Sequence, residues 1–204
     1  MESGAVLSRT LTKKEFALSG TEVRTAETEF LEGCRAGSLP TFERLYQAHG
    51  GPMKSIALNL LGNVADAEDA VQEAFLKVYR GARRFRGGSS FSTWLYRILV
   101  NTCYDLLRKR RRRAEGPLPA DVALISGRES DHPLRLSIEV ALRRLDFRER
   151  TVFLLCEVEG FSHREAAEVL DVNENTSRTL LFRAKKQLQR SLSSAGAFAP
   201  VEVS

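Results

Sequence analysis

The chain has 204 residues, which is enough for one ordinary domain or two small ones. Its 31 Lys and Arg residues outnumber its 26 Asp and Glu residues, and the resulting formal net charge of +5 admits an anionic partner without requiring one. Three scattered cysteines and three irregularly spaced histidines exclude a disulfide framework and show no metal-ligand spacing, so we expect reduced thiols and neither a metal nor a cofactor.

Residues 1–27 are rich in Ser, Thr and charged side chains and have weak apolar periodicity, so a poorly ordered extension is expected there. This segment lacks the charged start and apolar run of a secretion signal, and no stretch of the chain reaches membrane-spanning length. We therefore expect a cytoplasmic protein without membrane insertion.

Helical signals follow one another through residues 28–113, which we expect to form a first small domain. Two apolar-periodic stretches, 41–46 and 53–61, are separated by Gly50-Gly51-Pro52, which predicts a break between two short helices. Gly62 and Asn63 are typical of a helix end followed by a new helix start.

The next helix gives the clearest periodic signal, because its apolar residues recur at the spacing of one buried face: Ala67, Ala70, Val71, Ala74, Phe75 and Val78. After a Gly- and Ser-rich loop at 86–90, a second amphipathic run begins at Phe91. In the segment 77–113 every charged residue but Asp105 is basic, whereas 66–73 is acidic. This asymmetry indicates a polyanion on one surface and a different partner on another.

The segment 114–135 turns to Gly, Pro, Ser and Asp and predicts a flexible linker, and 136–192 forms a second helical set before a disordered tail at 193–204. No β-type alternation and no internal repeat occur. The fold class expected is therefore all-α, with two small helical domains joined by a linker.

The second domain carries the pattern of a helix-turn-helix. Ser162 and Glu165 form a capping box that begins one helix, and a polar turn at 171–173 leads into a helix from 174 to about 190. One face of that helix is apolar or small, and the opposite face suits the major groove, where Arg reads guanine and Asn reads adenine: Asn175, Arg178, Thr179, Phe182, Arg183 and Lys186. The alternative is a solvated basic helix in a small bundle.

Two further surfaces of the first domain attract attention. The acidic helix presents Asp66, Asp69, Gln72 and Glu73 on its solvent side, although an ordinary hydrated face is the alternative. Aromatic residues interleave with arginines between Phe85 and Tyr104, a combination that suits a single strand whose bases stack on rings. The alternative is that Phe91 and Trp94 belong to the core, and at least partial burial is expected.

Taken in order, these segments resemble the extracytoplasmic-function (ECF) sigma factors of bacterial RNA polymerase. The run DAEDAVQEAF at 66–75 and the run FRGGSSFSTWLYRI at 85–98 are similar to their region 2. The run EGFSHREAAEVLDV at 159–172, followed by ENTSR and LFRAK, is similar to their region 4. The resemblance extends from about residue 29 to 192.

The resemblance implies an initiation factor without a catalytic site of its own. It implies docking on a coiled coil of the polymerase's largest subunit by Asp66, Asp69, Gln72 and Glu73. It implies that a second set of residues recognises and melts the minus-ten element: Arg86, Trp94, Tyr96, Arg97, Asn101, Asp105 and Arg108. Among these, Asn101 is the best candidate for a contact in the base pocket. It implies minus-thirty-five recognition by the exposed face of the 174–190 helix. An anti-sigma factor is the expected regulator.

Three positions depart from the family pattern: Leu180 replaces a polar residue, Ser177 a small apolar one, and Asp146 a helix-opening Pro. Three other functions remain as alternatives. A free-standing helix-turn-helix regulator leaves the acidic helix without a role. A nuclease lacks a carboxylate and histidine set that could assemble a metal site. A protein with interaction roles alone does not explain the basic cluster.

Overall fold

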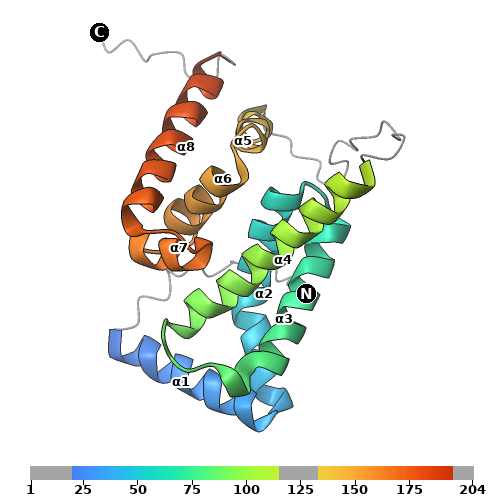
Figure 1. The fold of residues 1–204 in the computed structure, drawn as a ribbon, viewed down its shortest axis with the longest axis vertical. Helices are drawn as coiled ribbons and strands as arrows, with labels where there is room; N and C mark the ends of the chain where they lie inside the picture. The colour runs from blue at the N-terminus through green and yellow to red at the C-terminus, as the bar shows by residue number, and fades with distance from the viewer. Residues whose placement is uncertain (1–19, 115–132, 195–204) are drawn as a thin grey trace, which may run out of the picture.

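The computed structural model describes residues 20–114 and 133–194, in which all regular structure is helical and no strand occurs (Figure 1). The first part comprises α1 (Gly20–Ala36), α2 (Leu39–Leu61), α3 (Val64–Gly81), a 3₁₀ turn (Ala82–Arg84) and α4 (Phe91–Ala114). The second comprises α5 (Pro133–Arg143), α6 (Phe147–Phe153), a π-helical turn (Leu154–Val158), α7 (His163–Leu170) and α8 (Glu174–Ser194). The expected all-α class is confirmed.

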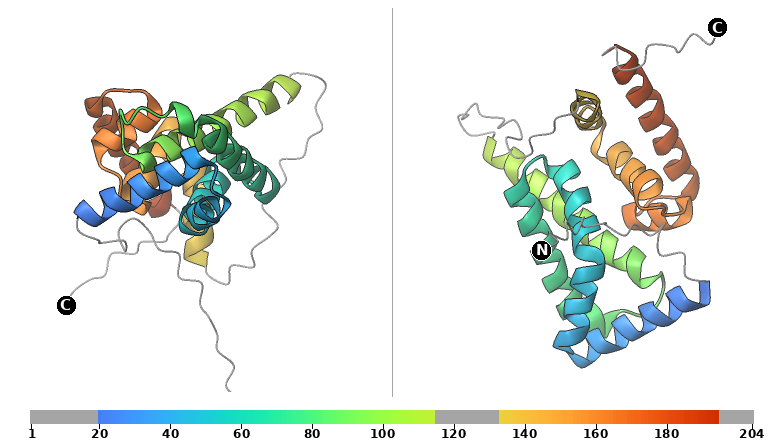
Figure 2. Two further views of the ribbon diagram at one scale, coloured as in Figure 1. Left: turned by 90° about the horizontal axis from the view of Figure 1, so that it is seen from below. Right: turned by 180° about the vertical axis from the view of Figure 1, so that it is seen from behind.

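The helix α1 begins at Gly20, inside the segment expected to be an extension, and crosses one end of the α2–α4 bundle (Figure 2). The helix α1 packs closely on α2 at Gly33. A side chain there would not fit, because a Cβ on Gly33 would lie 2.3 Å from the Thr41 hydroxyl oxygen. Cys34 is buried beside it. Tertiary packing of this kind is not visible in the local composition, which contains few apolar residues. The expected linker and tail fall largely outside the described residues.

The expected break between two short helices at Gly50-Gly51-Pro52 is wrong. The helix α2 is continuous from Leu39 to Leu61, and Pro52 lies inside it. A proline costs a backbone hydrogen bond at this point, but Leu45, Met53 and Ile56 recur on one helical face and are almost fully buried. The burial of these side chains compensates for the hydrogen bond lost at Pro52, because helical stability in proteins comes mainly from packing.

The boundary between α2 and α3 follows the expected chemistry. Gly62 ends α2 with a φ of 84°, a left-handed conformation that favours glycine. Asn63 caps α3 by accepting a hydrogen bond from the Asp66 backbone N–H. The six apolar residues assigned to one face of α3 are all buried, so this helix and its orientation are confirmed.

The helix-turn-helix is confirmed as well. Ser162 and Glu165 form the capping box of α7, and α7 ends at Asp171, whose φ of 54° reverses the chain. Asn173 then accepts a hydrogen bond from the Thr176 N–H at the start of α8. The inward face of α8 is buried as expected: Ser177, Leu181, Ala184 and Leu188.

The two parts of the chain pack directly against each other. Leu155, Phe161 and Val169, from the second part, join the same continuous core as Leu95 and Leu99 of α4. In Figure 1, α7 lies against the N-terminal half of α4. A smaller cluster, built around Ala184, joins α5 to α8. The sequence motifs therefore divide the chain into two modules, residues 20–114 and 133–194, but the main hydrophobic core contains residues of both.

Two of the three cysteines are buried and the third is half-buried. Burial raises the pKa of Cys34 to about 11 and that of Cys103 to about 12. Cys156 is half-buried, and burial raises its pKa to about 11. At neutral pH these thiols are protonated and therefore poor nucleophiles.

Candidate nucleic-acid interface

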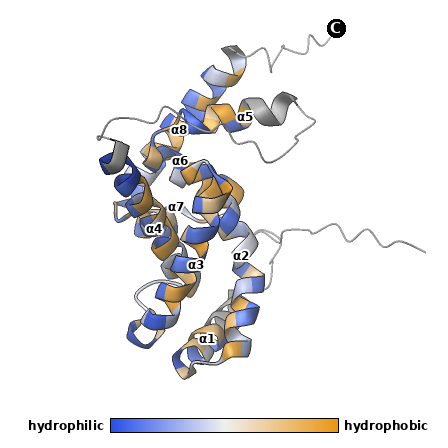
Figure 3. Cartoon of the chain, turned by 90° about the vertical axis from the view of Figure 1, so that its right-hand side faces the viewer, coloured by the Kyte–Doolittle hydropathy of each residue, from blue (hydrophilic) through white to orange (hydrophobic). Residues whose placement is uncertain are grey.

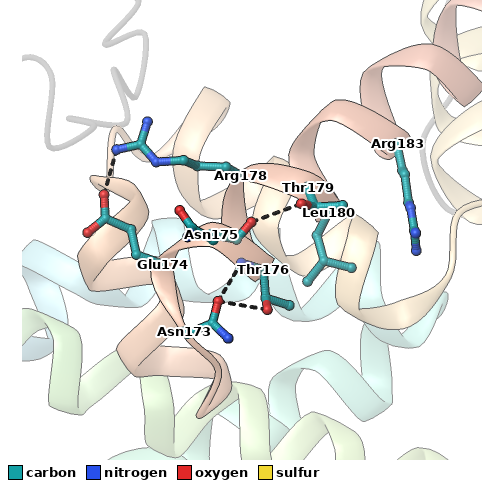
Figure 4. A pocket seen from close by; sticks show the side chains of 8 residues that line it. All are labelled: Asn173, Glu174, Asn175, Thr176, Arg178, Thr179, Leu180 and Arg183. Carbon is teal, nitrogen blue, oxygen red and sulfur yellow. Dashed lines mark hydrogen bonds and ion pairs between the residues drawn. The ribbon is translucent and has the colours of Figure 1, made fainter.

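The first candidate surface is the outer face of α8. All six side chains expected to contact duplex DNA are exposed there, and Phe182 keeps 67 % of its surface in solvent. A shallow groove follows the N-terminal half of the helix, and Figure 4 shows Arg178 and Arg183 at its two ends. An exposed Phe beside arginines gives this face both an apolar contact for a thymine methyl and charge for phosphates.

Hydrogen bonds within this face hold its side chains in place without burying them. Arg178 Nη2 donates to Glu174 Oε1 at 2.5 Å, and Thr179 Oγ1 donates to the Asn175 carbonyl oxygen at 2.9 Å (Figure 4). Exposed ion pairs stabilise a fold by at most about 1 kcal/mol. Arg178 can therefore exchange its carboxylate partner for a base or a phosphate at low cost.

The packing of α8 on α7 includes a polar contact that the sequence did not predict. His163 Nδ1 lies 3.1 Å from Ser177 Oγ, and Ser177 is fully buried. Ser177 is one of the departures from the family pattern, and its hydroxyl is satisfied here by the ring at the start of α7. At the other end of α8, Gln187 donates to the Arg144 carbonyl oxygen at 2.9 Å. Both contacts hold α8 against its neighbours while its outer face stays in solvent.

The second surface is the acidic side of α3. Asp69 and Gln72 are exposed, and Glu73 is half-buried with its carboxylate 3.8 Å from Lys77 Nζ. A groove between α3 and α4 runs beside them and is also lined by Asp105. The structure thus brings Asp105, expected at the minus-ten element, next to the acids expected to bind polymerase.

Asp66 differs from the other three acidic-face residues. Its carboxylate accepts hydrogen bonds from Asn63 Nδ2 and from Arg110 Nη1, both at 2.8 Å. The same guanidinium nitrogen also donates to the Leu61 carbonyl oxygen at 3.3 Å. Asp66 therefore ties the start of α3 to the basic end of α4, which Figure 3 shows as a hydrophilic segment.

The third surface is a stripe along α4. Trp94, Arg97, Asn101, Asp105 and Arg108 are separated by three or four residues, so they share one helical face. Asn101, Asp105 and Arg108 are exposed, whereas Trp94 and Arg97 are half-buried. The stripe combines one aromatic ring with amide, carboxylate and guanidinium groups, which is the chemistry that single strands and base edges require.

Trp94 closes an aromatic cluster at the start of α4. Its ring lies 4.9 Å from Phe85 and 5.7 Å from Phe91, centroid to centroid, and Phe91 is buried. The sequence expectation of partial burial is confirmed. Arg35 of α1, which the sequence analysis missed, donates to the Phe85 carbonyl oxygen at 2.6 Å and so holds the segment that precedes the exposed Arg86.

The comparisons with known proteins agree with this arrangement. The family Sigma-70 region 2 matches residues 45–113, and the family Sigma-70, region 4 matches residues 135–188. The ECF RNA polymerase sigma factor SigM of Mycobacterium tuberculosis is 32 % identical over 167 residues, covering 82 % of this chain and 85 % of that protein. The chain belongs to the ECF sigma factors.

Other relatives and solved structures extend the match. The ECF RNA polymerase sigma-E factor of Escherichia coli K12 is 36 % identical over 140 residues, covering 60 % of this chain and 72 % of that protein. CnrH, solved in complex with the cytosolic domain of CnrY, superposes with a TM-score of 0.65 at 25 % identity over 83 % of this chain and 98 % of that one. The sigma factor RpoE of Bartonella quintana, solved with the anti-sigma factor NepR, gives 0.63 at 27 % identity over 74 % and 96 %.

In this sigma factor, Tyr96 lies apart from the α4 stripe. Its side chain is 3 % exposed, its ring lies 4.9 Å from that of Phe161, and its hydroxyl donates to Glu159 Oε2 at 3.4 Å. Arg97, on the flank of the stripe, donates from Nε to the Glu168 carbonyl oxygen of α7 at 2.7 Å. Two residues expected at the minus-ten element are thus held by region 4, and the family runs that contain Glu159 and Phe161 carried no sign of this contact.

The buried pair formed by Glu159 and Tyr96 has shifted proton affinities. Burial raises the pKa of the Glu159 carboxyl above its usual range, and the hydrogen bond from Tyr96 opposes only part of that rise. Burial, with the Glu159 charge adding to it, raises the pKa of Tyr96 well above its usual range. Tyr96 is therefore a neutral donor at every physiological pH.

Two further observations concern metal binding and membrane insertion. Within residues 20–114 and 133–194, no group of three or more His, Cys, Asp or Glu side chains lies close enough to hold a metal ion. None of the helices in these ranges has the length and apolar character needed to cross a membrane.

Proposed function

We propose that this sigma factor binds the core of bacterial RNA polymerase and directs it to promoters whose minus-ten and minus-thirty-five elements it recognises. The observation that carries the proposal is the coexistence of the three surfaces in the order of sigma regions 2 and 4. A free-standing regulator needs only the α8 face, and it leaves the other two surfaces without use. The factor works in the cytoplasm and contributes no catalysis of its own.

Polymerase binding is assigned to Asp69, Gln72 and Glu73, with Asp66 contributing mainly by fixing the start of α3. The exposure of Asp69 and Gln72 supports this division, since a docking side chain must reach its partner. The ion pair of Asp66 with Arg110 supports a positioning role, because exchanging that partner also releases the end of α4.

Minus-ten recognition is assigned to Arg86 and to the α4 stripe, with Asn101 as the base-pocket contact and Tyr96 as part of the surrounding wall. Melting unstacks a base at a cost of a few kcal/mol, and stacking on an aromatic ring can return about 1–3 kcal/mol per base. The partly exposed ring of Trp94 supports this role. Arg97 and Arg108 supply the charge that follows the phosphates.

Minus-thirty-five recognition is assigned to the six exposed residues of α8, with Arg178 and Asn175 at base edges and Lys186 on phosphate. Regulation by an anti-sigma factor is proposed from RpoE of Bartonella quintana, which was solved with the anti-sigma factor NepR.

The test is run-off transcription from a promoter library with purified core polymerase. We expect defined start sites only when the sigma factor is added, and little binding to duplex DNA without polymerase. Transcripts that do not depend on the factor, or tight sequence-specific duplex binding in its isolated form, would contradict the proposal and favour a free-standing regulator.

A further inference from the structure

We propose that α1, which precedes the residues matched by region 2, belongs to the minus-ten site and acts there through Arg35. Arg35 is a positioning residue that fixes the backbone of Phe85. Through Phe85 it sets the place of the Trp94 ring and of the loop that carries Arg86. This inference rests on the proposed roles of Trp94 and Arg86 in minus-ten recognition.

The C-terminal end of α1 is closed by two backbone hydrogen bonds. The Gly37 N–H donates to the Cys34 carbonyl oxygen at 3.2 Å. The Ser38 N–H donates to the Gly33 carbonyl oxygen at 2.9 Å. Gly37 has a φ of 71°, the left-handed conformation that this type of helix end requires. The two bonds leave the carbonyl oxygen of Arg35 for a donor from outside the helix.

Arg35 and Arg83 exchange hydrogen bonds across the junction of α1 with the 3₁₀ turn. Arg83 Nε donates to the Arg35 carbonyl oxygen at 3.3 Å. Arg35 Nη2 donates to the Phe85 carbonyl oxygen at 2.6 Å, and its Nε donates to that of Ala82 at 3.4 Å. The end of α1 is therefore tied to the whole turn that precedes the loop, and Figure 1 shows this turn beside α1.

The backbone that Arg35 holds carries the ring on which Trp94 packs. The rings of Phe85 and Trp94 lie 4.9 Å apart, centroid to centroid, with an angle of 37° between their planes. A Cβ on Gly81 would lie 3.2 Å from Trp94 Cζ2, so the indole also packs against the end of α3. Because Trp94 is half-buried, a shift of Phe85 changes both the tilt of the indole and the part of it that a base can reach.

The loop between Phe85 and α4 is anchored at its two ends. At the far end, Ser90 Oγ accepts a hydrogen bond from the Thr93 N–H at 3.1 Å and caps α4. At the near end, the anchor is Phe85, held by the guanidinium group from α1. Between the anchors, a Cβ on Gly87 would have no neighbour within 4 Å, so this part of the loop lies in open space. The two anchors therefore decide where the exposed Arg86 side chain begins.

Other residues keep α1 on the bundle. Cys34 is buried in the main core, and Phe30 and Leu31 pack against that core. Arg35 itself is exposed. Loss of its guanidinium group therefore frees the turn and the loop while α1 stays docked, so that a positioning role can be separated from a stabilising one.

The experiment uses the full chain in four forms: wild type, Arg35→Ala, Arg35→Lys and Arg44→Ala. Arg44 is the matched control, because it is an exposed arginine of α2 whose guanidinium carbon lies 6.0 Å from the ring centroid of Phe30 on α1. With core polymerase, permanganate reactivity measures promoter opening, and competition between promoters with altered minus-ten bases measures discrimination. In the free chain, the emission of Trp94, the only tryptophan, reports the surroundings of the indole.

We expect Arg35→Ala to lower promoter opening about fivefold, the effect of losing an exposed charge-assisted hydrogen bond, and to weaken discrimination between minus-ten bases. Its Trp94 emission should move to longer wavelength, while its affinity for core polymerase and its melting temperature match wild type. Arg35→Lys keeps a cationic donor for one carbonyl oxygen and should recover part of the opening. Arg44→Ala should open promoters as wild type does.

An Arg35→Ala chain that opens promoters like wild type, or whose Trp94 emission is unshifted, overturns the inference. Equal losses in Arg35→Ala and Arg44→Ala overturn it as well, because they would show a general role of α1 in stability. If Arg35→Ala loses helicity, Arg35→Gln, which keeps one amide donor, takes its place. A failure of the proposed function looks different, since wild-type and variant chains alike would then give polymerase no defined start sites.

Discussion

The two helices proposed to meet DNA, α8 and α4, are used differently by the fold. The helix α8 is buried on one side, and the six residues assigned to DNA stand on the other side in solvent. The helix α4 packs against α2 and α3 on one side and against region 4 on another. Tyr96 is therefore buried, and Arg97 donates a hydrogen bond to the Glu168 carbonyl oxygen. A duplex can approach α8 in this conformation, whereas a single strand meets an α4 surface that is only partly available.

This difference suggests a division between the two kinds of readout. Duplex recognition needs an exposed helix face that fits the major groove, while melting needs aromatic and polar groups that can take up an unstacked base. The following predictions test this contrast, beginning with the largest expected effect.

Trp94→Ala should reduce transcription from a complete promoter roughly ten- to hundredfold, because loss of base stacking costs about 1–3 kcal/mol. Open-complex formation, measured by permanganate reactivity of unpaired thymines, should fall more than closed-complex binding. Trp94→Phe retains a ring beside Phe85 and Phe91 and should recover most of the activity. Equal loss of both complexes would remove Trp94 from melting, and thermal unfolding identifies any damage to the aromatic cluster.

Arg178→Ala should weaken transcription about tenfold at promoters that depend on the minus-thirty-five element, since a specific base contact is worth about 1–3 kcal/mol and its exposed partner Glu174 offsets little. Competition between promoters with and without that element measures the effect. Glu174→Gln is the control, because it releases the ion pair and leaves the guanidinium. Unchanged promoter preference in Arg178→Ala would exclude this residue from the readout.

Charge reversal of Asp69 and Glu73 to Lys should lower affinity for core polymerase about fivefold, because each exposed ion pair contributes up to about 1 kcal/mol. The effect should shrink at high salt, as screening requires. Native gels or fluorescence anisotropy with purified core measure it. The charge-matched control reverses two exposed acids elsewhere, Glu32→Lys on α1 together with Glu43→Lys on α2, and equal behaviour of the two double variants would place the docking surface elsewhere.

The smallest expected effect is a pH dependence of the contact between region 4 and α4, which is made in the closed form of the chain and broken in an open form. Burial raises the pKa of Glu159, so the closed form holds a proton more tightly than an open form whose carboxyl lies in water. The stabilisation of the closed form is complete below the ordinary carboxyl pKa and is lost as pH rises through the raised value. The radius of gyration, measured by X-ray scattering across this range, should increase with rising pH in wild type and stay constant in Glu159→Gln.

How much of this could be anticipated from the residues differs from element to element. Capping at Asn63 and Ser162, the buried face of α3 and the two faces of α8 follow from local spacing, and all are present. The helix across Pro52 could not be anticipated, because its stability depends on residues that pack from α3 and α4.

The candidate site divides in the same way. The amino-acid pattern determined which residues lie on a solvent face of α3 and α8, because helical periodicity separates a buried face from an exposed one. Only the tertiary structure decided that Asp66 pairs with Arg110 and that Glu159 covers Tyr96, 63 positions away along the chain. Periodicity tells that a face is buried, but the partner that buries it is chosen by long-range packing, and that choice decides which DNA-facing residues are open.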